Sequence, residues 1–422
     1  MKIAYRLFML SSILILSMVI NFSFADGFSQ NDQGAAATAQ GGAFVARANN
    51  LSALYFNPAG ITQLDGTQIS FGSNLIFPST TFSNSGGKCE MRDQVFYPVN
   101  LYLSHKMSQK LSFGFGYYRP FAYSSKWCPL FIGRFISQEF NLRAHYFTPV
   151  VAYQASPEIS VALGISYVYA KLDMSQSLDL SSFPYYYPPN AVPEGFSQFD
   201  SSGRGLAINL GLLYKLDEFW TLGISYRSAV DMDFSGNFDF TIPASSVGGE
   251  ADEILNGLFP DQSGSMSLKM PQILVVGLST SLIDRCSLEA DIQWSGWSCL
   301  KEIPVNYSII TEAVKDKIID RQWKNSFTFR LGAEYEYRPQ LLLRAGYSYD
   351  NSSIPGRTFD SMIPEALKQS LSGGVGIKWS NIDFDVAYAA VFYEKRTEDN
   401  QYLAGTYERF AHILSFSVTF KL

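Results

Sequence analysis

Apolar residues alternate strictly with small or polar residues along most of this chain, up to its last residue. Phe113, Phe115 and Tyr117, for example, are separated by single glycines. In residues 414–422, Leu, Phe, Val, Phe and Leu alternate with Ser, Ser, Thr and Lys. Successive side chains of a β-strand point to opposite faces, so this pattern predicts strands with one apolar face and one small or polar face.

A transmembrane barrel accounts for these strands better than a soluble sandwich does. Alternation suits both, because the apolar face can pack in a core or contact lipid. The strands, however, reach about ten residues or more, as a tilted membrane-spanning strand requires. Aromatic residues such as Trp379 gather at strand ends, where a girdle would lie. After residue 25, the longest uncharged apolar stretch, 273–283, is shorter than the roughly 18 residues of a membrane helix.

The connections between the strands alternate in length. Tight turns such as Arg338-Pro339 follow the even-numbered strands, and long loops rich in Pro, Ser and Asn follow the odd-numbered ones. Outer-membrane barrels have this arrangement, with the short turns on the periplasmic side. We therefore predict an all-β fold, a 14-stranded antiparallel transmembrane β-barrel plugged by a small N-terminal helical hatch. The predicted strands are 67–78, 94–105, 111–121, 140–153, 159–174, 204–216, 219–234, 264–282, 286–301, 324–337, 340–351, 370–379, 381–395 and 408–422.

Residues 1–25 have the parts of a secretory signal peptide. Lys2 and Arg6 precede an uncharged apolar run that ends at Ile20, and residues 23–25 resemble a small-x-small cleavage site. We expect the exported chain to begin near Asp26.

Residues 26–66 do not alternate and differ from the rest of the chain. They are rich in Gly and Ala and contain short helix-like pieces, which are broken by paired glycines and by Asn57-Pro58. A barrel of fourteen strands encloses a lumen too wide for side chains alone to fill. We expect residues 26–66 to form the hatch and residues 67–422 to form the barrel.

Charge and composition exclude several functions. The formal net charge is −6 and no basic run is present, which argues against a nucleic-acid partner. The chain has 3 His, at 105, 145 and 412, and none stands in a catalytic or metal-binding motif. We therefore expect no enzyme activity, no cofactor and no metal site.

The cysteines fall into two pairs. Cys286 and Cys299 bracket one predicted strand, so they lie too far apart for a disulfide. Cys89 and Cys128 fall in the first two predicted outer loops. An oxidising compartment allows a Cys89–Cys128 bridge, and two free thiols are the alternative.

The ordered motifs of the chain resemble the FadL family of outer-membrane transporters of long-chain fatty acids and aromatic hydrocarbons. Asn57-Pro58-Ala59-Gly60 looks like the hatch motif of that family. It follows Gly41 to Phe44 and Asn50 to Ala53. The further matches are Arg119 to Phe121, Gly133 to Phe135, Pro149 to Tyr153, Gly223 to Ser228, Arg344 to Tyr349, Ile354-Pro355 and Ile363-Pro364.

The resemblance implies passive, ligand-gated transport of hydrophobic compounds. A ligand would bind apolar outer loops, enter a site inside the barrel, and leave sideways into the bilayer beside the third strand when the hatch rearranges. Long-chain fatty acids and monoaromatic hydrocarbons are both open as substrates. A porin-like channel for small solutes is the alternative, and an adhesin role of the loops stays open.

The substrate-binding candidates lie in the hatch and on the lumen face of the barrel. They are Phe44, Phe56, Arg227, Arg330 and Arg344. By strand parity the three arginines point inward, where a carboxylate ligand would pair with them. The alternative is pairing with lumenal acids. Glu334 and Glu336 are on the face of Arg330, and Asp231 and Asp233 are placed on the face of Arg227.

Two further regions are candidates for ligand passage. Gly114, Gly116 and Pro120 would permit a break in pairing for lateral exit, and room for the hatch is the alternative role of the glycines. The outer-loop capture candidates are Tyr185, Tyr186, Leu255, Leu258 and Phe259, which could instead pack together and close the loops. The expected partners are outer-membrane lipid and lipopolysaccharide, a hydrophobic small molecule and the barrel-assembly machinery, with the chain a monomer in the outer membrane of a Gram-negative-type bacterium.

Overall fold

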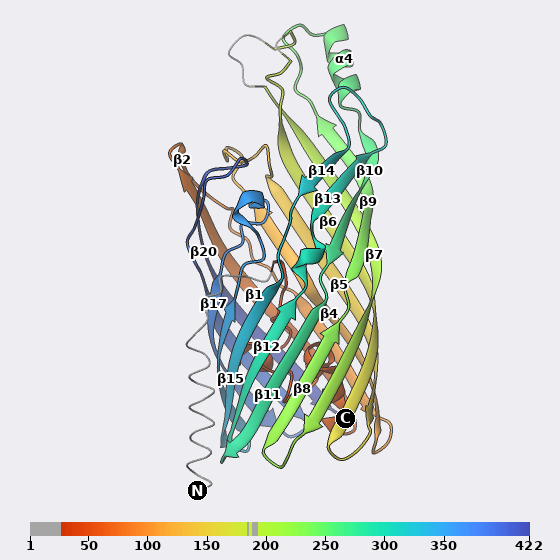
Figure 1. Cartoon of the computed structure of the whole chain (residues 1–422), viewed down its shortest axis with the longest axis vertical. Coiled ribbons are helices and arrows are strands. Elements are labelled where there is room, and N and C mark those ends of the chain that lie inside the picture. Colours follow the sequence, from red (N-terminus) through yellow and green to blue (C-terminus); the bar gives the residue numbers. More distant parts are fainter. Residues whose placement is uncertain (1–26, 184, 188–192) are drawn as a thin grey trace.

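The computed structural model describes residues 27–183, 185–187 and 193–422, and these form a tall β-barrel (Figure 1). The expected signal peptide, residues 1–25, lies outside the described residues, as do Pro184 and residues 188–192 of the predicted capture loop.

The described residues contain twenty antiparallel strands in one sheet, which closes where β1 pairs with β20. They are β1 (Thr67–Asn84), β2 (Gly87–Glu90), β3 (Val99–Lys106), β4 (Leu111–Lys126), β5 (Glu139–Gln154), β6 (Ile159–Asp179), β7 (Glu194–Lys215), β8 (Trp220–Arg227), β9 (Val230–Thr241), β10 (Gln262–Met270), β11 (Ile273–Ile283), β12 (Cys286–Ser295), β13 (Glu302–Tyr307), β14 (Lys317–Asp320), β15 (Ser326–Arg338), β16 (Leu341–Asp350), β17 (Lys368–Trp379), β18 (Ile382–Tyr393), β19 (Arg396–Glu398) and β20 (Gly405–Lys421).

The wall of the barrel has fourteen strands, which confirms the predicted fold class. Four wall strands are interrupted and contribute two elements each, namely β8 with β9, β10 with β11, β12 with β13, and β14 with β15. The short strands β2 and β19 extend outer loops by pairing with β1 and β20.

The interruption between β8 and β9 corrects one expectation. The continuous predicted strand 219–234 placed Asp231 and Asp233 on the face of Arg227. In the structure Ser228 and Ala229 separate the two strands, so the side that faces inward changes from odd to even residue numbers. Arg227 is buried, whereas Asp231 and Asp233 are exposed. The inward residues Arg227 and Val230 are three positions apart and not two, and this one-residue shift reverses the alternation of the faces.

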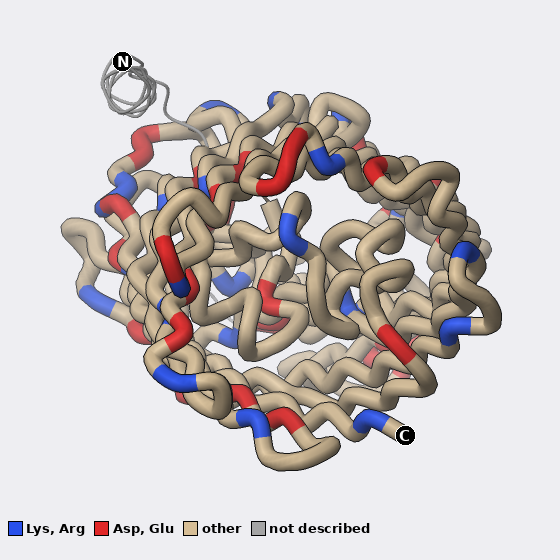
Figure 2. The backbone as a smooth tube through the Cα atoms, turned by 90° about the horizontal axis from the view of Figure 1, so that it is seen from below, with Lys and Arg blue, Asp and Glu red and all other residues tan. Residues whose placement is uncertain are grey.

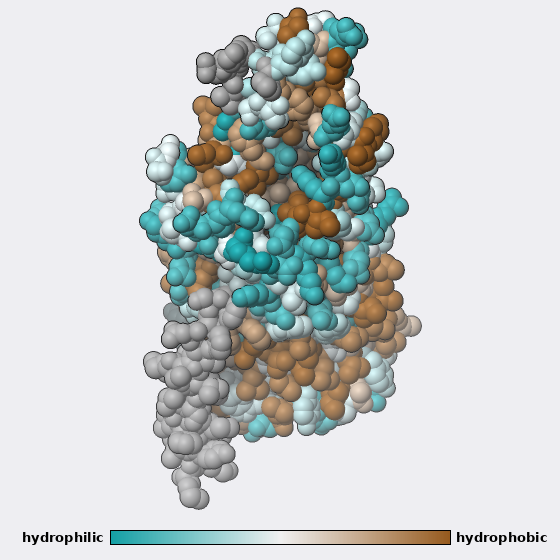
Figure 3. Space-filling model, turned by 45° about the horizontal axis from the view of Figure 1, so that its top comes forward, coloured by the Kyte–Doolittle hydropathy of each residue, from teal (hydrophilic) through white to brown (hydrophobic). Residues whose placement is uncertain are grey.

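The outer surface carries the lipid-facing band that the alternation predicted. On β6 every second residue from Ile159 to Tyr167 is an exposed large apolar or aromatic residue, and the residues between them are buried. Figure 3 shows such residues gathered over the lower part of the wall. Among the described residues, no helix combines the length and apolarity needed to cross a membrane.

The N-terminal segment, residues 27–66, lies inside the barrel (Figure 2). It contains the short helices α2 (Ala35–Thr38) and α3 (Ala53–Phe56) and the 3-10 helix η1 (Pro58–Gln63). Glycines of the wall allow its backbone to approach closely. A Cβ atom at Gly346 would lie 2.0 Å from the carbonyl carbon of Gln40, and one at Gly223 would lie 2.2 Å from the oxygen of Val45. The other helices in the described part of the chain are α4 (Glu250–Leu258), η2 (Trp297–Cys299) and η3 (Gly356–Thr358).

Candidate functional site

The wall has a break beside β4. The second wall strand was predicted at 94–105 but begins only at Val99, and β3 pairs with β4 no further than Tyr117. Beyond that point, the next backbone hydrogen bond between the two chain segments runs from Arg92 N to the Lys126 carbonyl, at 2.9 Å. The pairing of β4 with β5 also shifts register between Tyr118 and Phe121. Pro98 and Pro120 lack an N–H group, which explains why the ladder fails here.

The N-terminal segment covers this break from the lumen side. Gln30 donates its N–H to the Pro120 carbonyl at 2.8 Å, and Ala122 donates to the Phe28 carbonyl at 3.2 Å. Ser29 and Phe121 thus face each other as an antiparallel bridge. The segment supplies β4 with hydrogen-bond partners that its neighbour in the wall does not provide.

Aromatic contacts hold the start of this segment in place. The Phe28 ring packs edge-on against Trp297 at 4.6 Å and against Phe121 at 6.1 Å between centroids, and it lies 5.7 Å from Trp323. All four side chains are almost fully buried.

A cavity of about 690 Å³ adjoins the break, and we call it the chamber. Its lining combines residues 27–32 of the N-terminal segment, residues 94–98, the upper parts of β4 and β5, and lumen-facing residues such as Arg330 and Asp350. Asn141 and Arg143 of β5 also line it, although they lie on the outward face of that strand. The chamber therefore connects the lumen with the outer surface of the barrel, and its size is that of a small-molecule site.

The chamber carries an excess of unpaired positive charge. Arg119 donates to the Tyr97 carbonyl, Arg330 to the Gln293 side chain and Arg409 to the Pro364 carbonyl. Among the described residues, none of the three has a carboxylate within 4.0 Å. The two lysines of the lining each have a carboxylate partner. Lys126 pairs with Glu139 at 2.7 Å and Lys368 with Asp350 at 4.0 Å.

Aromatic rings add to the apolar character of the chamber. The Arg409 guanidinium lies 4.4 Å from the centroid of Tyr393 and 5.7 Å from that of Tyr123. Phe28, Phe96 and Tyr97 also contribute to the lining. The arrangement suits a ligand with an anionic head and an apolar body.

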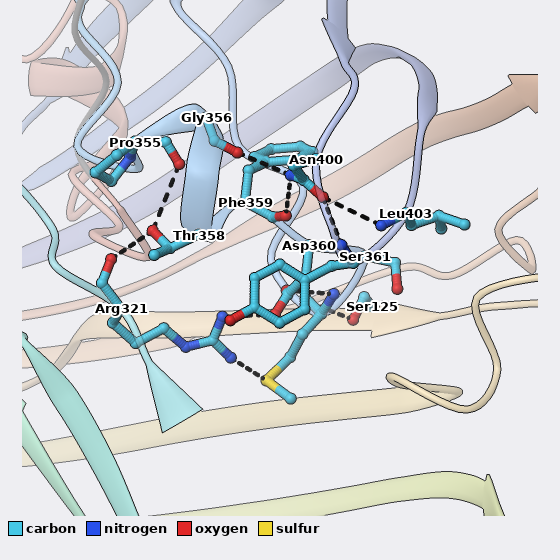
Figure 4. A network of polar contacts seen from close by, with 12 residues as sticks. Ser125, Arg321, Pro355, Gly356, Thr358, Phe359, Asp360, Ser361, Asn400 and Leu403 are labelled. Carbon is cyan, nitrogen blue, oxygen red and sulfur yellow. Dashed lines mark hydrogen bonds and ion pairs between the residues drawn. The ribbon is translucent and has the colours of Figure 1, made fainter. Parts of the chain in front are cut away.

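The loop of residues 351–367 folds inward above the chamber, and Figure 4 shows how it is held. Arg321 and Asp360 form a buried ion pair at 2.6 Å, and the hydroxyl of Thr358 donates to the Arg321 carbonyl. Asn400 donates to the carbonyls of Gly356 and Phe359. Ser125 of β4 donates its hydroxyl to the Met362 carbonyl at 2.8 Å, so three neighbouring segments hold the loop.

The same loop borders a second cavity of about 250 Å³ nearer the outer end. Asp360 and Met362 line this cavity, whereas Glu365 lines the chamber. The second cavity is mainly apolar, with Phe199 and Phe238 in its wall.

The predicted hatch motif joins the N-terminal segment to the wall. The Asn57 amide donates to the carbonyls of Val45 and Leu212, at 2.8 and 2.9 Å, and its oxygen accepts the Ala59 N–H. Asn57 thereby caps η1, and Pro58 takes the first helical position, where a missing N–H is harmless. Ala59 and Gly60 are buried in the same turn.

The predicted ligand-binding residues have different environments. Arg344 pairs with Glu334 at 2.6 Å and with Asp385 at 2.5 Å, so it has the lumenal acids that were the alternative to a ligand. Glu334 also pairs with Arg47 of the N-terminal segment, at 3.5 Å, and forms no ion pair with Arg330. Of the three arginines, only Arg330 lines the chamber.

Arg227 is buried below the chamber without a carboxylate partner among the described residues. It donates to Asn209 and to the Tyr55 carbonyl, each at 3.1 Å, and lies 4.5 Å from the Tyr55 ring centroid. Phe56 and Arg227 share a cavity of only about 20 Å³. Phe44 packs on Phe56 and is fully buried.

The lateral-exit candidates divide between two environments. A Cβ atom at Gly114 would lie 2.5 Å from the Leu54 side chain, and one at Gly116 would lie 3.5 Å from it. Both glycines therefore pack against α3, as the alternative role foresaw. Pro120 instead lies within the register shift and accepts the hydrogen bond from Gln30.

The outer-loop candidates also divide. Leu255 and Phe259 are buried in a cluster with Leu180, Tyr187 and Val314, against which Tyr186 and Leu258 pack. Tyr185 is 75% exposed and is available to a ligand. Elsewhere in the outer loops, Cys89 and Cys128 form a disulfide.

Sequence reasoning missed the carboxyl groups that bind the N-terminal segment. Asp291 accepts the N–H groups of Phe44 and Val45, at 2.9 and 3.3 Å. Glu289 accepts those of Ala46 and Arg47, at 2.6 and 3.1 Å. Their spacing of two on a lumen face of otherwise small or polar residues was the available signal. Arg119 and Arg409 of the chamber were also missed, although Arg119 stands in a quoted motif.

Comparisons with known proteins agree with this geometry. A family model described as "Outer membrane protein transport protein (OMPP1/FadL/TodX)" matches residues 16–422. Outer membrane protein P1 of Haemophilus influenzae is 24% identical over 396 residues, which cover 86% of this chain and 83% of that protein. The long-chain fatty acid transport protein of Salmonella typhi is 22% identical over 389 residues, which cover 86% and 85%.

Two solved structures share the fold. A Pseudomonas aeruginosa FadL homologue has a TM-score of 0.83 at 19% identity, covering 94% of this chain and 100% of its own. The Ralstonia pickettii toluene transporter TbuX has a TM-score of 0.67 at 18% identity, covering 92% and 98%.

Proposed function

Because this chain belongs to the FadL family of outer-membrane proteins that transport hydrophobic compounds, its barrel lies in the outer membrane of a Gram-negative-type bacterium, and we propose that it transports long-chain fatty acids or related anionic amphiphiles by passive diffusion. The family consists of transport proteins. Assembly by the barrel-assembly machinery and a monomeric state stay predictions.

The observation that carries this proposal is the set of three guanidinium groups in the chamber. Arg119, Arg330 and Arg409 donate to neutral oxygens and have no carboxylate within 4.0 Å among the described residues, so a carboxylate head would gain charge-assisted hydrogen bonds with them. The apolar and aromatic lining would contact the hydrocarbon tail. A monoaromatic hydrocarbon, which is the alternative substrate, has no use for such charges.

The route in this proposal begins at the outer loops. Exposed apolar side chains such as Tyr185 capture the ligand, and the 250 Å³ cavity lies between them and the chamber. The N-terminal segment acts as the hatch. When residues 28–30 leave β4, the break opens toward the bilayer and the ligand leaves sideways.

A binding measurement with purified protein tests the head-group assignment. The variant Arg330→Gln with Arg409→Gln should bind palmitate about tenfold more weakly than the wild type, because two charge-assisted contacts are lost. Hexadecanol has the same chain without the charge, and its binding should change less than twofold. Arg338→Gln, in an exposed periplasmic turn, is the control.

An equal loss of palmitate and hexadecanol would contradict the assignment, as would unchanged palmitate binding. A wild-type protein that binds toluene and no palmitate would favour the monoaromatic alternative.

A further inference from the structure

A row of basic residues crosses the outward face of four consecutive strands. Each lies two residues from an outward-facing residue that is nearer the membrane, and residues two apart share a face. The row is Arg119 on β4, Arg143 on β5, Lys171 on β6 and Arg204 on β7, directly above Tyr117, His145, Tyr169 and Leu206.

The members of the row are neighbours across the sheet. Arg143 lies directly opposite Lys171, and Arg204 lies opposite Tyr169, which places it diagonally from Lys171. Like charges directly opposite each other destabilise a sheet, so this arrangement favours an external anion.

Carboxylates near the row neutralise it only in part. Asp173 pairs with Arg143, and Asp200 lies opposite Asp173, farther from the membrane. Asp233 lies opposite Arg204 on β9 and accepts a hydrogen bond from Ser267. Within the described part of the chain, neither Lys171 nor Arg204 has a carboxylate within 4.0 Å.

The height of the row on the barrel identifies the anion. The outward residues of β6 from Ile159 to Tyr169 are all apolar or aromatic. The inward residues between them are mostly small. Ten residues at about 3.3 Å each, tilted by about 40°, span about 25 Å, the height of the apolar band of an outer-membrane barrel. Lys171 is the next outward residue, so its ammonium group lies at the level of the lipid head groups of the outer leaflet.

We propose that this row binds the phosphate groups of lipopolysaccharide. Guanidinium and ammonium groups bind phosphate strongly, and lipopolysaccharide carries phosphates at this level of the outer leaflet. Arg119 and Arg143 also line the chamber, so the bound lipid stands at the outer mouth of the wall break. The binding is independent of which ligand the chain transports.

Lipid binding to the purified protein tests this site. Lys171→Ala with Arg204→Ala removes two row cations that lack a carboxylate among the described residues, and it spares Arg119 and Arg143, which line the chamber. It should weaken binding of diphosphorylated lipopolysaccharide about 20-fold, since each cation near a lipid surface contributes about a factor of five. Dephosphorylated lipopolysaccharide should bind the variant and the wild type equally weakly. Lys171→Arg with Arg204→Lys should retain binding.

The matched control is Lys88→Ala with Lys395→Ala, two exposed cations elsewhere that are paired with Glu90 and Glu408. Heat-modifiable migration on gels checks that each barrel is folded. The proposal is overturned if the control weakens binding as much as the test variant, or if the test variant binds normally. If palmitate competes with lipopolysaccharide for these cations, the row binds the transported ligand and the proposal is wrong, whatever transport assays show.

Discussion

Alternation alone does not give the partners of single lumenal residues. They also depend on interruptions of the strands and on contacts with the interior segment. The inward positions of Arg330 and Arg344 follow from parity, because β15 and β16 are continuous. The parity of Asp231 relative to Arg227 does not, because a two-residue interruption between them gives no strong sequence signal. Glu334 also pairs with Arg47. Arg47 belongs to the interior segment, whose position does not follow from the register of any strand.

Glu289 and Asp291 should hold the hatch closed. Together they accept four consecutive N–H groups of residues 44–47, at about 1 kcal/mol per hydrogen bond. Glu289→Ala with Asp291→Ala should therefore raise the frequency of channel openings in planar bilayers at least tenfold, with the barrel still folded. Asp284→Ala, in the exposed turn before β12, is the control. An opening frequency equal to that of the wild type would show that other contacts hold the segment.

At the scale of elements, the strands were predictable and their interruptions were not. Predicted strand 94–105 contains alternating residues as far as Gln94, yet β3 starts at Val99, because Pro98 cannot donate to a ladder. Before Val99, Phe96 forms an isolated bridge with Ile76 of β1. The proline was visible in the sequence. That residues 28–30 would pair with β4 in place of this neighbour was not, since such a contact joins segments about ninety residues apart.

A reversible disulfide cross-link between the N-terminal segment and β4 should stop transport. Ser29 and Phe121 face each other as a non-hydrogen-bonded pair, whose Cα atoms lie close enough for a disulfide. Ser29→Cys with Phe121→Cys should abolish uptake of a labelled fatty acid when oxidised and restore it on reduction. The single variant Phe121→Cys is the control for loss of the Phe121 packing, and Ser29→Cys is the control for the added thiol. Normal uptake by the oxidised double variant would mean that the route does not pass through the break.

At the scale of the whole molecule, the wall closes without the interior segment. The wall strands pair in a ring from β1 to β20, and this closure needs no residue before Thr67. The period of two and the turn lengths therefore predicted the barrel. The path of residues 27–66 inside it rests on particular contacts, such as those of Asn57 with Val45 and Leu212, which the motif alone could not specify.

Deletion of residues 33–63 should leave the barrel assembled and make it permeable to sugars. The deleted residues fill the lumen, whereas the ladders that close the wall are outside them. The variant should still migrate differently on gels before and after boiling, because a closed barrel has every strand edge paired. Liposomes that contain it should swell in sugar solutions, and liposomes with the wild type should not, which also distinguishes the family function from a porin-like channel. If the deletion variant folds and remains impermeable, residues 33–63 are not the hatch, and the infolded loop 351–367 becomes the segment that blocks the lumen.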